Sequence, residues 1–132
     1  MNEIPVGAVN EQRLLVTPEV AISFLGHDGA RVLSTPHMIA YMEWTSRNAV
    51  KPYLGEGRDS VGTIVNVRHL AATPVGLSVT FRSRVTAVDG NRVTFHVEAE
   101  DEHEKIGEGT HERFVVDVNR FVTKLAMKRE AV

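Results

Sequence analysis

The second half of the chain alternates between apolar and polar positions, which is the pattern of β-strands. Residues 61–70, 77–87 and 93–99 place apolar side chains at every second position, and residues 106–118 continue as a fourth strand. Residues 61–70 are apolar at positions of both parities, so we expect both faces to be partly buried. Asp89-Gly90 predicts a hairpin turn. The pattern therefore predicts four long antiparallel strands in succession, the last with Gly107 and Gly109 as bulge or close-approach positions.

The first half has a different period. Residues 37–50 contain no glycine or proline and are apolar on most sides, which predicts a helix in the middle of the fold. Ser34-Thr35-Pro36 is its start signal, with Thr35 as the expected cap. Residues 13–16 indicate a short strand, and Thr17-Pro18-Glu19 predicts a short helix that ends at Gly26. The spacing after residue 118 predicts a short amphipathic helix at the end.

These elements define an α+β domain, in which one curved antiparallel sheet surrounds one helix. The length of 132 residues fits a single domain, residues 1–132. One layer of sheet around one helix leaves apolar surface uncovered at its ends. We therefore expect the domain to pair with a second copy as a homodimer.

Composition excludes several classes of function. Fifteen Lys and Arg against 17 Asp and Glu give a net charge of −2, which argues against nucleic-acid binding. The chain has no cysteine, so a thiol nucleophile, disulfides and Cys-based metal sites are excluded. No apolar run is long enough for a membrane span, and the opening residues MNEIP lack the basic and apolar regions of a signal peptide, so we expect none. We expect a cytoplasmic protein with no membrane partner.

Glu43 stands out because it lies between Met42 and Trp44 in the most apolar helix. In one interpretation it lies on a narrow polar stripe and pairs with Arg47 one turn later. In the other it is a carboxylate held in an apolar site, where burial would raise its pKa and make it a general base or nucleophile. The sequence leaves both open.

Thr35 and His69 are the other candidates. Thr35 either caps the helix or reaches the side of the helix that carries Glu43, eight residues later. His69 shares a strand face with Val65 and Val67, so it is either a packed core residue or a catalytic group. No pair of histidines has a metal-ligand spacing on a helix, and we expect no metal site.

Three segments resemble a known family. Residues 33–44 read LSTPHMIAYMEW, residues 60–63 and 67–76 read SVGT and VRHLAATPVG, and residues 106–113 read IGEGTHER. Together they are similar to hotdog-fold acyl-CoA thioesterases, in particular the fluoroacetyl-CoA thioesterase family, over roughly residues 14–122. The resemblance implies a hotdog fold, a dimer with active sites at the subunit interface, and hydrolysis of an acyl-CoA substrate without a cofactor.

The resemblance also assigns roles to residues. Thr35, Glu43 and His69 match the catalytic threonine, glutamate and histidine of the family, while Gly62 and Arg113 match substrate-binding positions. Glu43 would attack the thioester carbonyl or activate a water molecule, and His69 would polarise the carbonyl or act as acid and base. The backbone N–H of Gly62 would stabilise the developing oxyanion. The three catalytic residues are expected to share one pocket.

The acyl group is less well defined. Residues 25–32, LGHDGARV, lack the aromatic rings of the family's lid, so we expect a general thioesterase rather than one selective for a fluorinated acyl group. Met38, Met42 and Trp44 are expected to line an apolar pocket for a short or aromatic acyl chain. The alternatives are a hotdog hydratase or dehydratase, a non-catalytic domain that binds acyl-CoA or another apolar ligand, and a dimeric scaffold in which Thr35 caps, Glu43 pairs with Arg47 and His69 packs.

Overall fold

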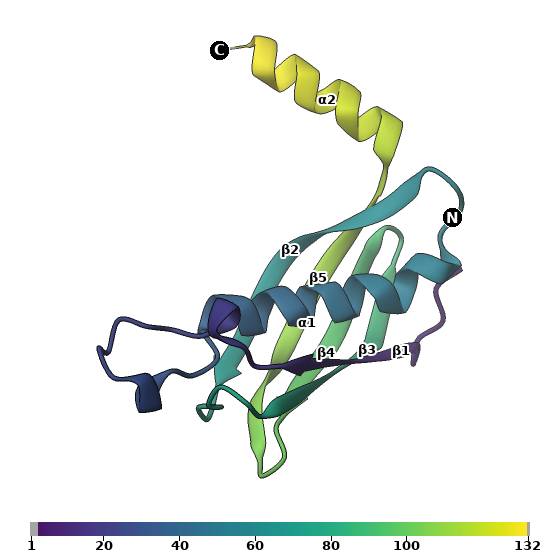
Figure 1. Cartoon of the computed structure of the whole chain (residues 1–132). Helices are drawn as coiled ribbons and strands as arrows, with labels where there is room; N and C mark the ends of the chain where they lie inside the picture. Colours follow the sequence, from purple (N-terminus) through teal and green to yellow (C-terminus); the bar gives the residue numbers. More distant parts are fainter. Residues whose placement is uncertain (1–2, 132) are drawn as a thin grey trace.

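The computed structural model describes residues 3–131, and its elements follow the order that the periodicity predicts. Figure 1 shows one long helix lying against one curved sheet, with a second helix projecting from the sheet's end. The strands and helices are β1 (Val9–Leu15), α1 (Thr35–Val50), β2 (Arg58–His69), β3 (Ser78–Asp89), β4 (Arg92–Glu100), β5 (Lys105–Asp117) and α2 (Val118–Glu130). The α+β prediction is confirmed.

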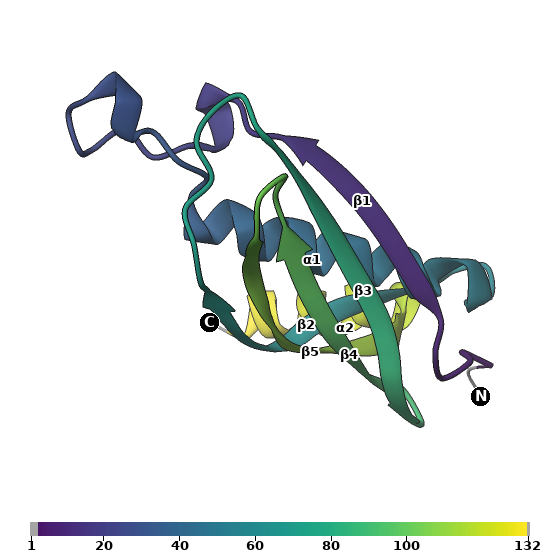
Figure 2. The same ribbon diagram turned by 90° about the horizontal axis from the view of Figure 1, so that it is seen from below.

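The five strands form one antiparallel sheet in the order β1-β3-β4-β5-β2. The hairpin between β3 and β4 turns at Gly90, whose φ of 61° suits glycine. β2 pairs with β5 with one irregularity, where Gly62 is opposite Arg113 and Ile64 is opposite Glu112, so Thr63 is the extra residue. Seen from below in Figure 2, the strands curve around α1.

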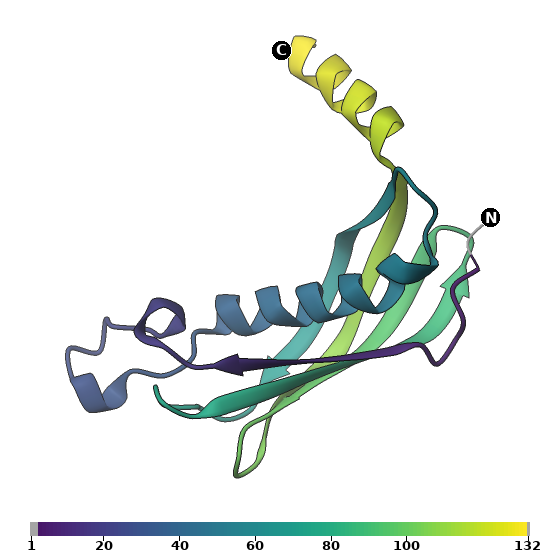
Figure 3. The ribbon, with the colours of Figure 1, turned by 45° about the vertical axis from the view of Figure 1, so that its right-hand side comes forward.

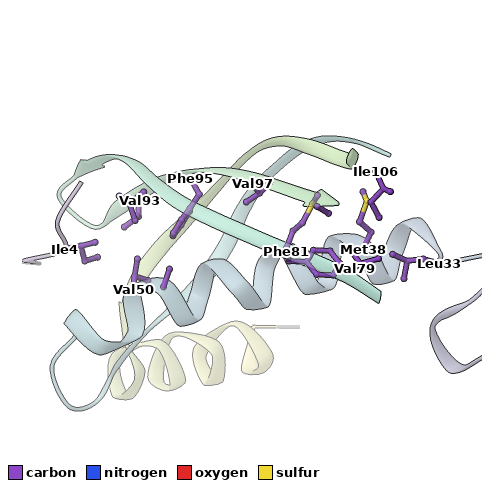
Figure 4. Packing of buried hydrophobic residues seen from close by; sticks show 14 of the residues in the cluster. Ile4, Leu33, Met38, Val50, Val79, Phe81, Val93, Phe95, Val97 and Ile106 are labelled. Carbon is purple, nitrogen blue, oxygen red and sulfur yellow. The ribbon is translucent and has the colours of Figure 1, made fainter. Parts of the chain in front are cut away.

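The core lies between α1 and the concave face of the sheet, as Figure 4 shows. β4 supplies the clearest alternation, because every second residue from Val93 to Ala99 is fully buried while the residues between them are not. Phe81 stacks on Tyr41 of α1 with ring centroids 5.6 Å apart. These apolar contacts are the main source of stability, since burial of such side chains contributes roughly 1.5–3 kcal/mol each.

One polar contact crosses this apolar core. The Ser46 hydroxyl on α1 donates to the Met42 carbonyl at 2.8 Å and lies 2.7 Å from the Ser83 hydroxyl on β3. Both serines are fully buried. The pair is therefore satisfied within the protein, as buried polar groups require.

The structure corrects two predictions at the N-terminal side. The first strand begins at Val9 rather than Arg13: on this edge strand Glu11 faces water, while Asn10 and Gln12 are partly buried and form hydrogen bonds with Thr45 and Asn48 of α1. Thr17-Pro18-Glu19 opens only a 3₁₀ turn, Pro18–Val20, and a second one follows at Asp28–Ala30. Thr17 stands at the N-cap position but makes no side-chain capping hydrogen bond, and no residue of the turn Pro18–Val20 is buried against the core to stabilise a longer helix.

β2 is also more exposed than the pattern predicted. Ile64 and Val65 keep 52% and 41% of their surface exposed, although they point to opposite faces of the strand. The reason is that β2 is an edge strand, with only β5 beside it. An exposed apolar edge of this kind is a site for pairing with another chain.

The amphipathic helix at the C-terminal side is present as α2, and it runs to Glu130. Asp117 caps it by accepting a hydrogen bond from the Arg120 backbone N–H at 3.1 Å. No residue of α2 is buried among those described, and Figure 3 shows the helix extending away from the sheet. Within residues 3–131, no helix combines the length and apolar character that crossing a bilayer requires.

Candidate active site

The first group of candidate residues lies where α1 begins and β2 ends. The Thr35 hydroxyl is 2.7 Å from Nδ1 of His69. The His69 Nε2 atom is shielded from water and makes no hydrogen bond of good geometry within the described chain. Burial lowers the pKa of His69, and a contact with the Ala71 backbone only partly opposes this. His69 is therefore a neutral imidazole near pH 7, free to accept or donate a proton.

Thr35 does not cap α1. The cap is Ser34, whose hydroxyl accepts a hydrogen bond from the His37 backbone N–H at 3.2 Å, while Thr35 is the first residue of the helix. The hydroxyl of Thr35 is consequently available to His69. Pro36 follows within the first turn, where its missing N–H costs nothing.

A cavity of about 380 Å³ opens beside this pair. Its walls come from the loop before α1 and from the residues that follow β2. It is lined by Ile22, Phe24, Val32, Leu33, Ser34, Thr35, His69, Leu70, Ala71 and Ala72. Most of these side chains are apolar, so the cavity suits an apolar group placed next to Thr35 and His69.

The expected pocket lining was wrong. Met38 and Met42 are buried in the core, with at most 2% of their surface exposed. Trp44 is half exposed and carries the Arg47 guanidinium 5.0 Å above its ring. The helical periodicity could not distinguish the face of α1 that packs on the sheet from the face that borders a cavity.

Glu43 belongs to a second group of polar residues in the middle of α1. Its Oε2 atom accepts a hydrogen bond from Nη1 of Arg113 at 3.4 Å, and 40% of its side chain is exposed. A Cβ at Gly62 would lie 2.6 Å from the same oxygen, so only glycine lets the carboxylate approach β2 this closely. The structure thus brings Glu43, Gly62 and Arg113 together.

Both sequence-based interpretations of Glu43 need correction. Arg47 does not pair with Glu43; it makes two hydrogen bonds to Asp59, of 3.0 and 2.7 Å. These bonds hold the pKa of Asp59 below its usual range, together with the Ser60 backbone N–H. Glu43 is also not enclosed by apolar groups, since its carboxylate is partly exposed and has a cation beside it.

Arg113 is held by β2 rather than by Glu43 alone. Its Nε donates to the Ser60 hydroxyl and its Nη2 to the Ser60 carbonyl, both at 2.7 Å. The guanidinium is almost completely buried, and this burial lowers its pKa, although the Glu43 charge opposes the effect. Arginine remains charged even so, which gives the site a fixed cation next to Glu43.

Sequence reasoning missed His111, which is buried beside Arg113 on β5. Its Nε2 lies 3.3 Å from Nη1 of Arg113, and its Nδ1 lies 2.7 Å from the Ile64 carbonyl oxygen. The two-residue spacing from His111 to Arg113 puts both on one strand face, and this signal was available in the sequence. This spacing alone did not identify His111 as a site residue, because nothing in the sequence showed that Arg113 faces α1.

The two groups of residues are separate within one protomer. Thr35 and Glu43 are eight residues apart on α1, which corresponds to about 12 Å of helix rise. Within one protomer the cavity beside Thr35 and His69 is not lined by Glu43, and a pocket shared by the three residues at the subunit interface stays a prediction. The helix places both groups along the side that β2 borders.

A cluster of His and Glu side chains and a second cavity lie outside the two groups of site residues. His96, Glu98 and Glu108 bring possible metal-ligand atoms within 4.8 Å of one another across two strands, a placement that no helical spacing in the sequence predicts. Lys105 already forms ion pairs with both glutamates, at 3.4 and 3.0 Å. A cavity of about 630 Å³ lies between α2 and the end of β5, away from Thr35 and Glu43.

The fold defines the class of protein as a hotdog-type α+β domain. Its candidate site residues are the Glu43 carboxylate and the His69 imidazole, which lie at different positions along the central helix. A model of the fluoroacetyl-CoA-specific thioesterase family matches residues 16–119. The chain therefore belongs to the fluoroacetyl-CoA-specific thioesterase family, and the predicted family and the assignment as a thioester hydrolase are confirmed.

Individual relatives agree with this assignment. The fluoroacetyl-CoA thioesterase of Streptantibioticus cattleyicolor is 42% identical over 100 residues, which cover 76% of this chain and 72% of that protein. A solved structure of the fluoroacetyl-CoA thioesterase FlK has a TM-score of 0.86 at 34% identity and covers 96% of this chain and 98% of its own. A thioesterase superfamily member from Thermus thermophilus has a TM-score of 0.86 at 33% identity, with 100% of both chains covered.

Proposed function

We propose that the protein hydrolyses an acyl-CoA thioester to the free acid and CoA. The observation that carries this proposal is the placement of Glu43. Its carboxylate lies against the backbone of Gly62, with Arg113 as a cation beside it and an open path to solvent. Family membership supports the same activity, since the relatives that resemble this chain are described as fluoroacetyl-CoA thioesterases.

Glu43 has two chemically balanced routes. As a nucleophile, its oxygen bonds to the thioester carbonyl carbon, the C–S bond breaks to release the CoA thiolate, and water then cleaves the resulting anhydride. As a general base, it removes a proton from water, the hydroxide adds to the carbonyl carbon, and the tetrahedral intermediate expels the same thiolate. In both routes the thiolate takes up a proton, which a neighbouring acid or the solvent supplies.

The remaining residues assist this step. The Gly62 backbone N–H is a donor for the carbonyl oxygen as it becomes negative. His69, neutral near pH 7, supplies or accepts a proton, and Thr35 fixes its ring through the 2.7 Å contact. Arg113 directs the Glu43 carboxylate toward Gly62 through the contact from its Nη1. This scheme needs no metal or cofactor.

We propose a short or aromatic acyl group. The cavity beside Thr35 and His69 has apolar walls and a volume of about 380 Å³, which fits a small acyl chain. Phe24 lines its entrance and is 80% exposed. One ring at the entrance does not make an enclosed aromatic gate, so we expect acetyl-CoA and fluoroacetyl-CoA to be distinguished only weakly.

We further propose that the active form is a homodimer paired along β2. β2 is an edge strand with exposed apolar side chains at Ile64 and Val65, and Trp44 on α1 is half exposed beside it. A two-fold axis perpendicular to β2 at the middle of this edge would place the Thr35–His69 pair of one protomer opposite Glu43 of the partner subunit. The two separate groups would then form one complete site at each end of the interface.

The test is release of free thiol from a panel of acyl-CoAs, from acetyl and fluoroacetyl to phenylacetyl and long-chain. We expect hydrolysis of a short or aromatic member. Glu43→Gln should lower kcat by about two to four orders of magnitude, because the amide neither attacks nor accepts a proton. Glu56→Gln, on the exposed loop before β2, is the matched control and should leave kcat unchanged.

Two results would contradict the proposal. If a folded protein hydrolyses no member but shows a thermal shift with acyl-CoA, it is a binding domain. If Glu43→Gln retains wild-type kcat, another group carries the reaction.

For the wild-type enzyme, a single turnover with enzyme in excess in ¹⁸O-water separates the nucleophilic route from the general-base route. In the general-base route ¹⁸O enters every product carboxylate. In the nucleophilic route, opening of the anhydride at the glutamyl carbonyl places ¹⁸O in the Glu43 carboxylate instead.

A further inference from the structure

His111 occupies a buried position whose hydrogen bonds determine its protonation state. Only 2% of its surface is exposed, and its ring stacks on Phe95 with centroids 5.9 Å apart. Nδ1 lies 2.7 Å from the carbonyl oxygen of Ile64 on β2. A carbonyl oxygen can only accept a hydrogen bond, so Nδ1 must carry the proton.

The other ring nitrogen has the opposite requirement. Nε2 lies 3.3 Å from Nη1 of Arg113. A guanidinium has only N–H donors, so Nε2 must be the unprotonated acceptor. The two contacts together define a neutral imidazole with its proton on Nδ1.

Arg113 transmits this requirement to Glu43. Ser60 already receives hydrogen bonds from Nε and Nη2 of the guanidinium, which leaves Nη1 as the nitrogen that faces both His111 and Glu43. The contact from Nη1 to Glu43 Oε2 is 3.4 Å, and the contact to His111 Nε2 is 3.3 Å. One nitrogen with two N–H groups can serve both acceptors only while His111 accepts.

We propose that His111 is a positioning residue for the hydrolysis: as the Nδ1–H tautomer it holds Arg113 in the orientation that directs the Glu43 carboxylate to Gly62. His111 does not touch the position of the thioester in this scheme; it acts through Arg113. Its effect on rate rests on the proposed function, whereas the tautomer and the contact with Arg113 do not.

Protonation of His111 would disrupt this arrangement. Arg113 and Glu112 on β5 and Glu43 on α1 are the charged groups that face the ring, while β2 contributes the Ile64 carbonyl and β4 contributes Phe95. Burial lowers the pKa of His111 despite the Ile64 carbonyl, and the Arg113 charge acts in the same direction as burial. A proton on Nε2 would place two hydrogen-bond donors, both positively charged, against each other, so Nη1 of Arg113 would lose His111 as one of its two acceptors.

The tautomer can be measured without any turnover. Long-range ¹H–¹⁵N correlation spectra of the wild-type protein at pH 7 report the protonation of each imidazole nitrogen. We expect a protonated Nδ1 and an unprotonated Nε2 for His111, assigned by comparison with His111→Gln. A proton on Nε2 would overturn the proposal.

The rate is tested with two variants that differ in hydrogen-bonding ability. A glutamine at 111 can donate to Ile64 and accept from Arg113, while His111→Leu fills similar space and does neither. We expect His111→Leu to lower kcat by about tenfold to a hundredfold with little change in KM, the loss typical of a hydrogen bond to a charged group, and His111→Gln to recover most of it. His96→Leu, on the outer face of β4, is the matched control.

The outcomes separate the two proposals. If the wild-type protein hydrolyses no acyl-CoA, the proposed function fails while the NMR measurement still decides the tautomer. If hydrolysis occurs and His111→Leu, shown to be folded by its near-UV circular dichroism, matches wild type in kcat, His111 is only a core residue. If His111→Leu does not fold, the comparison of His111→Gln with the wild type decides. A kcat of His111→Gln close to wild type supports the proposal. A loss of kcat as large as that in Glu43→Gln overturns it, because keeping both hydrogen bonds at position 111 would then not be sufficient to position Arg113.

Discussion

Two adjacent hydroxyl groups at the start of α1 serve different purposes. Ser34 has extended backbone angles and caps the helix, while Thr35 is helical and contacts His69. Both residue types are good caps and both precede Pro36, so local sequence rules could not assign the roles. The partner of Thr35 lies 34 residues away, and only the folded chain reveals it.

This division of roles can be tested by changing one hydroxyl at a time. Ser34→Ala should reduce the free energy of unfolding by about 1 kcal/mol through loss of the cap, and it should leave kcat nearly unchanged. Thr35→Val keeps the shape of the side chain without the hydroxyl, so it should lower kcat and leave the unfolding free energy nearly unchanged. Urea denaturation and thiol release measure the two quantities. If Thr35→Val instead lowered the unfolding free energy and Ser34→Ala lowered kcat, Thr35 would be the structural residue.

One buried and one partly buried histidine make stability depend on pH. Burial lowers the pKa values of His69 and His111 in the folded protein, whereas an unfolded histidine titrates near 6.5. Below about pH 6.5 the unfolded chain therefore binds more protons than the folded one, and the free energy of unfolding must fall as the pH falls. This loss begins at higher pH than any loss due to Asp59, a carboxyl whose pKa is lowered.

Urea midpoints at pH 7.5, 6.5 and 5.5 measure this dependence. We expect the midpoint to decrease across the series in the wild type and to decrease less in His111→Gln, which cannot titrate. His103→Gln, in the exposed turn between β4 and β5, should follow the wild type. A midpoint that stays constant from pH 7.5 to 5.5 would contradict neutral burial of the two rings.

At the scale of elements, the periodicity of the sequence located the long strands and the central helix to within a few residues. The period-two alternation in β4 and the uninterrupted apolar run of α1 were sufficient to locate these elements, because the apolar residues of each pattern are the ones that the element buries. The bulge at Thr63 and the partners of Glu43 were not predictable. Both depend on how β2 and β5 pair across about 50 residues of chain, which local patterns do not encode.

The spacing between β2 and β5 depends on Gly109, as the close-approach prediction indicated. An added Cβ would overlap the Asn66 carbonyl oxygen and lie 2.6 Å from the Val67 Cα, both of them backbone atoms that cannot move alone. Gly109→Ala should therefore cost at least about 2 kcal/mol of unfolding free energy. Gly55→Ala has nothing within 4 Å of its new Cβ and should change stability by less than about 0.5 kcal/mol.

Differential scanning calorimetry of the two glycine variants checks this expectation. If Gly109→Ala melts with the wild type, the strands can separate locally without loss. A shift in Gly55→Ala as large as that in Gly109→Ala would show that the cost comes from glycine replacement in general rather than from contact with β2.

For the whole molecule, the separation of Thr35 from Glu43 predicts sites shared between subunits. Dimers that combine one Thr35→Ala chain with one Glu43→Ala chain contain one site without either group and one site with both. Co-expression of the two inactive variants should therefore restore about a quarter of wild-type activity, since half of randomly paired dimers are mixed and half of their sites are complete.

The same experiment has a clear negative result. If each site draws Thr35 and Glu43 from one chain, no pairing of the two variants contains a complete site, and the co-expressed mixture stays inactive. Light scattering after gel filtration establishes that the mixture is dimeric. A monomeric wild-type enzyme with full activity would contradict the shared site altogether.

The serine pair in the core has a consequence for how α1 is aligned. Apolar side chains tolerate small rotations and translations of a helix, because their contacts are not directional. The contact between Ser46 and Ser83 is directional: if α1 slid by one turn, the Ser83 hydroxyl on β3 would lose its partner inside the core, at a cost of about 1–3 kcal/mol, while Ser46 would keep only its bond to Met42. The pair thus selects one setting of the helix among several that would bury similar apolar area, and that setting is the one in which Thr35 meets His69 and Glu43 meets Arg113.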